Sequence, residues 1–116
     1  MDFTTTVFLL GGHDLEMVTI KQLLFEHGFT EGKNIEDVNL QWGAKLSEYK
    51  HLFNDEQTFV GIELEMDIDP PLHYIRIDHH NENSHKPSSL EQLAELLDIT
   101  LTKKQQLILN NVKFSY

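Results

Sequence analysis

The segment TTTVFLLGG, residues 4–12, predicts a buried strand that ends in a tight turn. Its threonines and valine favour extended backbone, and the unbroken apolar run at residues 7–10 is typical of a strand covered on both faces. The glycines at positions 11 and 12 then let the backbone turn sharply. The chain is therefore expected to begin with a strand that leads directly into a loop.

A helix is predicted immediately after this turn. From Asp14 onward, apolar residues recur at the spacing of one helix face, and Gly28 supplies a stop. The residues that define this face are Met17, Ile20 and Leu24. The N-terminal part of the chain therefore predicts a strand, a turn and a helix, in that order.

The middle of the chain predicts a helix followed by two strands. Residues 43–53 favour the helix, and residues 60–68 alternate strictly between apolar and polar side chains, as in a half-buried strand. Proline ends this strand because it donates no ladder hydrogen bond, and residues 73–78 favour the next one. Residues 30–41 are mixed and polar, and they predict no particular element.

Two helices are predicted towards the C-terminus. Ser88 opens the first with a capping box, and Leu90 and Leu93 follow at helical spacing. Thr102 opens the second in the same way. Strands separated by helices favour an α/β fold. We therefore expect a single Rossmann-like layered domain over residues 1–116, with a mostly parallel sheet flanked by helices.

Composition narrows the classes of protein to which the chain can belong. The 116 residues contain no cysteine, and no apolar stretch approaches the roughly 20 residues that cross a bilayer. We therefore expect no membrane insertion, and the lack of cysteine suits the cytoplasm. The net charge of −10 argues against an extended nucleic-acid surface, which needs clustered lysine and arginine. This net charge is compatible with a small substrate, or with a substrate that a metal ion bridges to the protein.

The first cluster of candidate functional residues follows the first strand. His13, Asp14 and Glu16 lie in the predicted loop and at the start of the helix. In open α/β sheets, ligands bind outside the carboxyl ends of the strands, so this is a favourable place for a site. Asp14 is also an ordinary helix cap, and solvent exposure would explain His13 and Glu16 equally well.

The second cluster is Asp78, His79 and His80, at the end of the strand predicted over residues 73–78. An acid next to imidazole nitrogens combines ligands that suit Mn²⁺, Fe²⁺ or Zn²⁺. The alternative is that Asp78 caps a loop and that both histidines are solvated. The strand context favours the metal-binding interpretation.

The predicted strand over residues 60–68 adds a row of carboxylates. Glu63, Glu65, Asp67 and Asp69 fall on its polar side. Such a row usually marks the solvated face of an edge strand. The association of carboxylates with hard cations makes Glu63 or Glu65 the candidate that turns towards a metal.

Taken in order, these features resemble the first three motifs of the DHH phosphoesterase family over residues 4–112. The resemblance implies hydrolysis of a phosphoester or phosphoanhydride with a divalent metal, with Mn²⁺ the expected ion. It implies a phosphatase or related hydrolase whose partner is a phosphate-containing small molecule or a short oligonucleotide.

The resemblance also implies roles for individual residues. Asp14 and Glu16 stand for the acidic pair of the first motif, and Glu63 stands for the acid of the second. His80 is the implied catalytic residue, which would face the substrate phosphate. The implied metal ligands are His13, Asp14, Glu16, Glu63, Asp78 and His79.

The sequence departs from the family pattern at several points. Leu10 occupies a position where the family commonly has histidine, and Glu16 replaces the usual aspartate. A further acidic ligand and the substrate-holding second domain have no counterpart before Tyr116. One hypothesis is an enzyme completed by another chain, by a missing segment or by a second copy in a homo-oligomer. The others are a truncated, non-catalytic metal- or nucleotide-binding domain and a plain structural module.

Overall fold

A parallel sheet is the centre of the computed structural model, which describes residues 3–12, 15–37, 44–79, 88–103 and 105. Within these residues the sheet has four strands in the order β2-β1-β3-β4, and every neighbouring pair is parallel. The strands are β1 (Thr6–Leu10), β2 (Ile35–Glu36), β3 (Thr58–Ile62) and β4 (Tyr74–Ile77). The expected α/β fold with a parallel sheet is confirmed.

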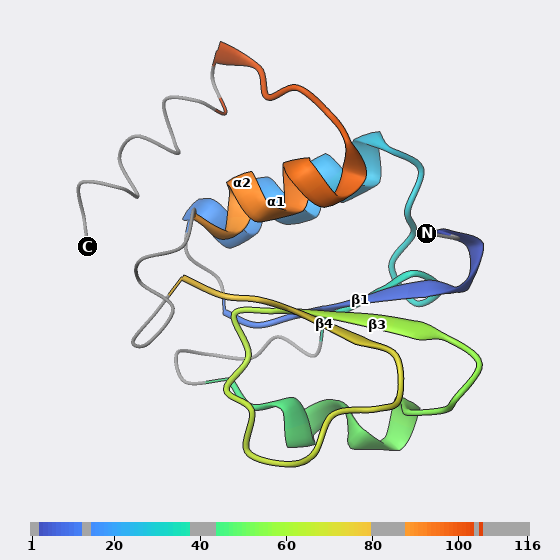
Figure 1. Ribbon diagram of the computed structural model, residues 1–116. Coiled ribbons are helices and arrows are strands. Elements are labelled where there is room, and N and C mark those ends of the chain that lie inside the picture. The colour runs from blue at the N-terminus through green and yellow to red at the C-terminus, as the bar shows by residue number, and fades with distance from the viewer. Residues whose placement is uncertain (1–2, 13–14, 38–43, 80–87, 104, 106–116) are drawn as a thin grey trace.

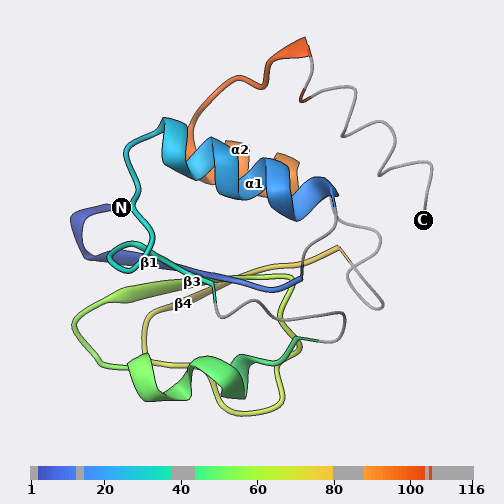
Figure 2. The ribbon, with the colours of Figure 1, turned by 180° about the vertical axis from the view of Figure 1, so that it is seen from behind.

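Helices cover both faces of the sheet, as Figures 1 and 2 show. Helices α1 (Leu15–Glu26) and α2 (Ser89–Leu97) lie side by side on one face. A 3₁₀ helix, η2 (Leu46–Leu52), lies on the other face, and a short 3₁₀ turn, η1 (Phe3–Thr5), precedes β1. The expected layered arrangement is therefore confirmed, although the helix predicted over residues 43–53 is a 3₁₀ helix.

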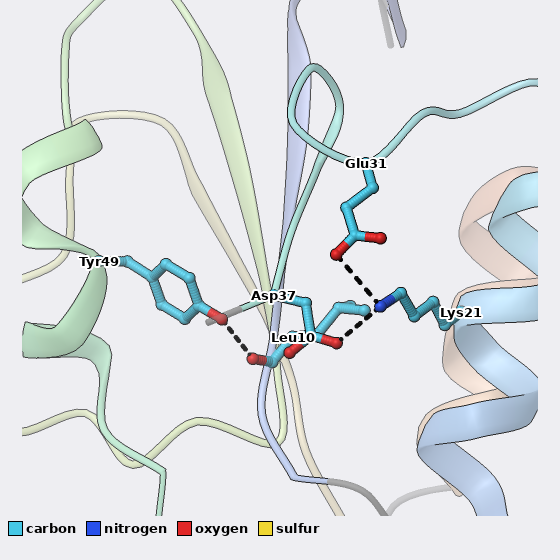
Figure 3. A network of polar contacts seen from close by, with 5 residues as sticks. All are labelled: Leu10, Lys21, Glu31, Asp37 and Tyr49. Carbon is cyan, nitrogen blue, oxygen red and sulfur yellow. Dashed lines mark hydrogen bonds and ion pairs between the residues drawn. The ribbon is translucent and has the colours of Figure 1, made fainter. Parts of the chain in front are cut away.

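Strand β1 lies at the centre of two apolar clusters. All five of its residues are buried, as the unbroken apolar run predicts. Phe8 and Leu10 point towards α1 and α2, whereas Val7 and Leu9 pack with residues of η2. The buried Tyr49 hydroxyl of η2 donates a hydrogen bond of 2.6 Å to the carbonyl oxygen of Leu10 (Figure 3). This bond satisfies a backbone acceptor at the end of the strand.

The strand predicted over residues 60–68 is wrong in extent and position. Strand β3 ends at Ile62, because Glu63 adopts a left-handed backbone conformation with φ of 59°. Beyond that point the described residues show an isolated bridge between Lys45 and Glu65 rather than a strand. Moreover, β3 pairs with β1 on one side and β4 on the other, so it is a central strand and not an edge.

The predicted helix caps are confirmed where the structure describes them. Ser88 and Glu91 form a reciprocal capping box at the start of α2. Thr102 and Gln105 exchange the corresponding pair of hydrogen bonds, at 2.8 and 3.2 Å. In the described parts of the chain, no helix has both the length and the apolar character needed to cross a membrane.

Candidate functional site at the carboxyl edge of the sheet

Three strands end together at one edge of the sheet. Leu10 of β1 is in register with Ile62 of β3, and Ile62 is in register with Ile77 of β4. The residues that follow these positions therefore leave the sheet side by side. Helix α2 begins near the same edge (Figure 1). The expected convergence of the three segments is thus present for their described residues.

Glycine is needed where β1 leaves this edge. A Cβ atom at Gly11 would lie 2.6 Å from the carbonyl oxygen of Glu63 and 2.9 Å from the Leu64 side chain. Gly12 has a φ of 87°, in the left-handed region that favours glycine. The two glycines thus serve different purposes: close approach of β1 to the end of β3, and a turn.

The first turn of α2 is hydrogen-bonded to all three segments. The Leu90 backbone N–H donates to a carboxylate oxygen of Glu16 at 2.9 Å, and the Ser89 hydroxyl donates to Glu63 Oε1 at 2.5 Å. The Gln92 side-chain amide donates to the carbonyl oxygen of Asp78 at 2.9 Å. One helical turn therefore connects the start of α1 with the ends of β3 and β4.

Glu16 is buried at this junction, with 2% of its surface exposed. Solvent exposure, the alternative explanation for this residue, is therefore wrong. A carboxylate is stabilised near a helix N-terminus by the backbone N–H groups and the helix dipole. The bond from Leu90 accounts for the burial of Glu16 without a metal ion, and its proposed role as a ligand stays a prediction.

Glu63 is the acid of its row that lies at the candidate site. Its carboxylate is partly buried against α2, whereas Glu65, Asp67 and Asp69 are exposed. The pKa of the Asp67 carboxyl group is lowered chiefly by a hydrogen bond from the Ser47 side chain, and the Ser47 backbone N–H, which donates to Asp67 at 3.0 Å, adds to this shift. Of the two candidates, Glu63 and Glu65, the structure therefore places Glu63 at the edge where the strands end.

Asp78 and His79 are buried as they leave β4, with 9% and 6% of their surfaces exposed. The alternative of a solvated His79 is therefore wrong.

Arg76 lies 3.5 Å from a carboxylate oxygen of Asp78. Burial raises the pKa of the Tyr74 phenol to about 12; the charge of Arg76 opposes this shift and that of Asp78 adds to it. Tyr74 and Arg76 of β4, together with Asp78 just after its end, thus form a polar row.

A metal site cannot be assembled from the described residues alone. Over residues 3–12, 15–37, 44–79 and 88–103, no three His, Asp or Glu side chains lie together in an arrangement that could hold a metal ion. His13, Asp14 and His80 lie outside the described residues. The donor chemistry of Glu63, Asp78 and His79 nevertheless fits a divalent cation, since it combines carboxylate oxygens with an imidazole.

A hollow of about 470 Å³ adjoins the candidate site beside α1. Lys21 lines it and contacts Asp37 at 3.0 Å and Glu31 at 3.4 Å (Figure 3). Burial lowers the pKa of the Lys21 ammonium, but the two acids outweigh this effect and raise it above its ordinary value. The hollow is lined by Leu10, Gly12, Met17, Val18, Lys21, Gln22, Phe25 and Asp37.

Sequence reasoning did not identify Ser89, Gln92 and Arg76 as neighbours of the site. A signal for the first two lies in the overlapping capping boxes of residues 88–92. Ser88 and Glu91 form the cap, which leaves Ser89 and Gln92 to contact other segments. For Arg76, the signal is its position two residues before Asp78 in the same strand, because alternate residues share a face.

Comparisons of the chain with models of protein families, with curated proteins and with solved structures found no match.

Proposed function

We propose that this domain belongs to a divalent-metal-dependent hydrolase of phosphoesters or phosphoanhydrides, of the DHH type, with Mn²⁺ as its ion. The observation that supports the proposal is the burial of Asp78 and His79 at the end of β4, next to the end of β3 that carries Glu63. Carboxylate and imidazole groups are the types of ligand that transition metals bind in proteins. Open parallel sheets also bind their ligands at this edge.

Residues outside the described part of the chain would complete the site. In this proposal the described residues do not hold an ion alone: His13 and Asp14 complete a ligand set that also draws on Glu16, Glu63, Asp78 and His79, while His80 contacts the substrate phosphate. When bound, the metal would lower the pKa of a water molecule and neutralise phosphoryl oxygens. The chain's own residues would hold these ligands in place and exclude bulk water from the buried side of the edge.

The proposed substrate is a phosphate-containing small molecule or a short oligonucleotide. The chain has 9 lysines and arginines against 19 acids, so it lacks the cationic surplus that tracks a long phosphate backbone. A metal ion would instead provide the positive charge that meets the substrate. We place this activity in the cytoplasm, since the chain contains no cysteine to form disulfides.

Metal binding and hydrolysis can be measured separately on the full chain, purified without a histidine tag. We expect at least one Mn²⁺ per chain by isothermal titration calorimetry. We also expect release of phosphate or nitrophenol from pyrophosphate, a short oligonucleotide or bis-nitrophenyl phosphate. His79→Ala should weaken Mn²⁺ binding by more than about 10-fold, the loss that removal of a residue orienting a ligand already causes. His80→Ala should keep Mn²⁺ binding and lower turnover.

His73→Ala is the matched control, since His73 is exposed and precedes the opposite end of β4. It should change neither metal affinity nor turnover. Mn²⁺ binding without hydrolysis would favour the non-catalytic metal- or nucleotide-binding domain. If the wild-type chain binds less than about half an equivalent of Mn²⁺, both metal hypotheses fail.

A further inference from the structure

We infer that Ser89 is a positioning residue for the proposed metal ligand Glu63, and that the first turn of α2 thereby orients the candidate site. The inference rests on the proposed function. Ser89 lies outside the three segments that resemble the family motifs, which are residues 13–16, Glu63 and residues 78–80. The Ser89 hydroxyl donates a hydrogen bond of 2.5 Å to Glu63 Oε1 across 26 positions of sequence.

The bond directs the side chain of Glu63 while leaving it able to bind a cation. An ionised carboxylate offers about four lone-pair sites on two oxygens, so one accepted hydrogen bond uses part of its capacity. Ligating carboxylates commonly accept such hydrogen bonds from neighbouring groups, which fix their orientation and tune their affinity for the metal.

Ser89 is well placed to act as a fixed donor. It is buried, with 0% of its surface exposed, and it is the first residue of α2. The reciprocal bonds between Ser88 and Glu91 hold the start of this helix, and the bond from Leu90 to Glu16 ties it to α1. The hydroxyl is therefore presented from a backbone that is anchored on both sides.

The backbone conformation of Glu63 also supports a functional role for its side chain. Its φ of 59° lies in the left-handed region, where a Cβ atom crowds the following carbonyl oxygen. This conformation ends β3 and accompanies the contact of the carboxylate with α2. Residues in sparsely populated conformations occur often at functional sites.

The test is Mn²⁺ affinity, measured by calorimetry on the full-length chain with Ser89→Ala, Ser89→Thr and Ser47→Ala. We expect Ser89→Ala to raise the dissociation constant about 10-fold or more, as removal of a hydrogen bond to a ligand does. Ser89→Thr keeps a hydroxyl and should recover most of the affinity. Ser47→Ala is the control, because it removes a serine hydroxyl whose partner, the exposed Asp67, lies outside the candidate site.

A double-mutant cycle separates positioning from a general structural effect. In a Glu63→Gln background, Ser89→Ala should change Mn²⁺ affinity less than about twofold, because the two residues act through one contact. Equal losses in the wild-type and Glu63→Gln backgrounds would overturn the inference, as would an unchanged or tighter dissociation constant for Ser89→Ala. Failure of the wild-type chain to bind Mn²⁺ would instead overturn the proposed function.

Thermal unfolding of the metal-free variants supplies the remaining control. If Ser89→Ala is unfolded under the conditions of calorimetry, Mn²⁺ affinity is compared between the wild-type chain, Ser89→Thr and Glu63→Gln. Glu63→Gln should then lower affinity at least as much as loss of the Ser89 hydroxyl. A Ser89→Thr or Glu63→Gln variant that is folded and binds Mn²⁺ more tightly than the wild-type chain would overturn the inference.

Discussion

Gly61 of β3 lies against the phenol of Tyr74 from the neighbouring strand. A Cβ atom at position 61 would overlap the Tyr74 hydroxyl oxygen and press against its ring. We therefore expect Gly61→Ala to lower the free energy of unfolding by about 1–3 kcal/mol, as overpacking of a core does. Urea denaturation measures the change. In combination with Tyr74→Ala the added cost of Gly61→Ala should largely vanish, and additive losses would contradict this contact as the cause.

The partly buried phenol of Tyr74 should also make stability fall at high pH. Its pKa is raised from 10.0 to about 12, chiefly by burial. As the pH rises above 10, the unfolded chain loses this proton while the folded chain retains it, so unfolding becomes more favourable up to about pH 12. Urea midpoints measured from pH 9 to 11.5 should show this fall. Tyr74→Phe should remove part of it, and an identical decline in both proteins would contradict the assignment.

The identities of the candidate site residues could be read from the sequence better than their surroundings. Asp78 and His79 follow a short strand, as expected, and Glu63 was one of two acids singled out for a place at the edge. The burial of Glu16 could not be foreseen, because it depends on a backbone N–H of Leu90, 74 positions away. Contacts at such separations leave no local pattern in the sequence.

At the scale of the elements, the sequence predicted the strands, helices and caps that depend on interactions between neighbouring residues. Strand β1, helix α1 and the cap at Ser88 follow from neighbouring residues and are present. The end of β3 was missed because the alternation of apolar and polar residues continues after the strand stops at Ile62. Strand β2 has two residues in a polar segment, and its pairing with β1 gives no periodic signal.

Helix α2 depends on its buried face for stability. Leu93 has 0% of its surface exposed and belongs to the cluster between the helices and the sheet. We expect Leu93→Ala to lower the free energy of unfolding by about 2–5 kcal/mol, through lost burial and the cavity left behind. Guanidinium denaturation measures this loss. Leu72→Ala is the control, since Leu72 is 69% exposed, and similar losses in both variants would contradict the packing of α2.

At the scale of the whole molecule, the large negative net charge favours unfolding at low ionic strength. The chain has a net charge of −10, and like charges in a folded domain repel one another. Ion pairs such as Lys21 with Asp37 offset part of this repulsion locally. Salt screens charges separated by more than the Debye length, which is about 10 Å at 0.1 M, so it weakens the long-range repulsion more than the close pairs.

We therefore expect the melting temperature at pH 7 to rise between about 10 and 300 mM NaCl, a range over which the Debye length falls several-fold. The measurement is thermal unfolding followed by circular dichroism, with a chelator present so that bound metal does not contribute. Near the isoelectric point of about 4.9 the net repulsion disappears, and the same range of salt should have a smaller effect. A melting temperature that falls with salt at pH 7 would show that close ion pairs outweigh the repulsion, because screening would then remove more attraction than repulsion.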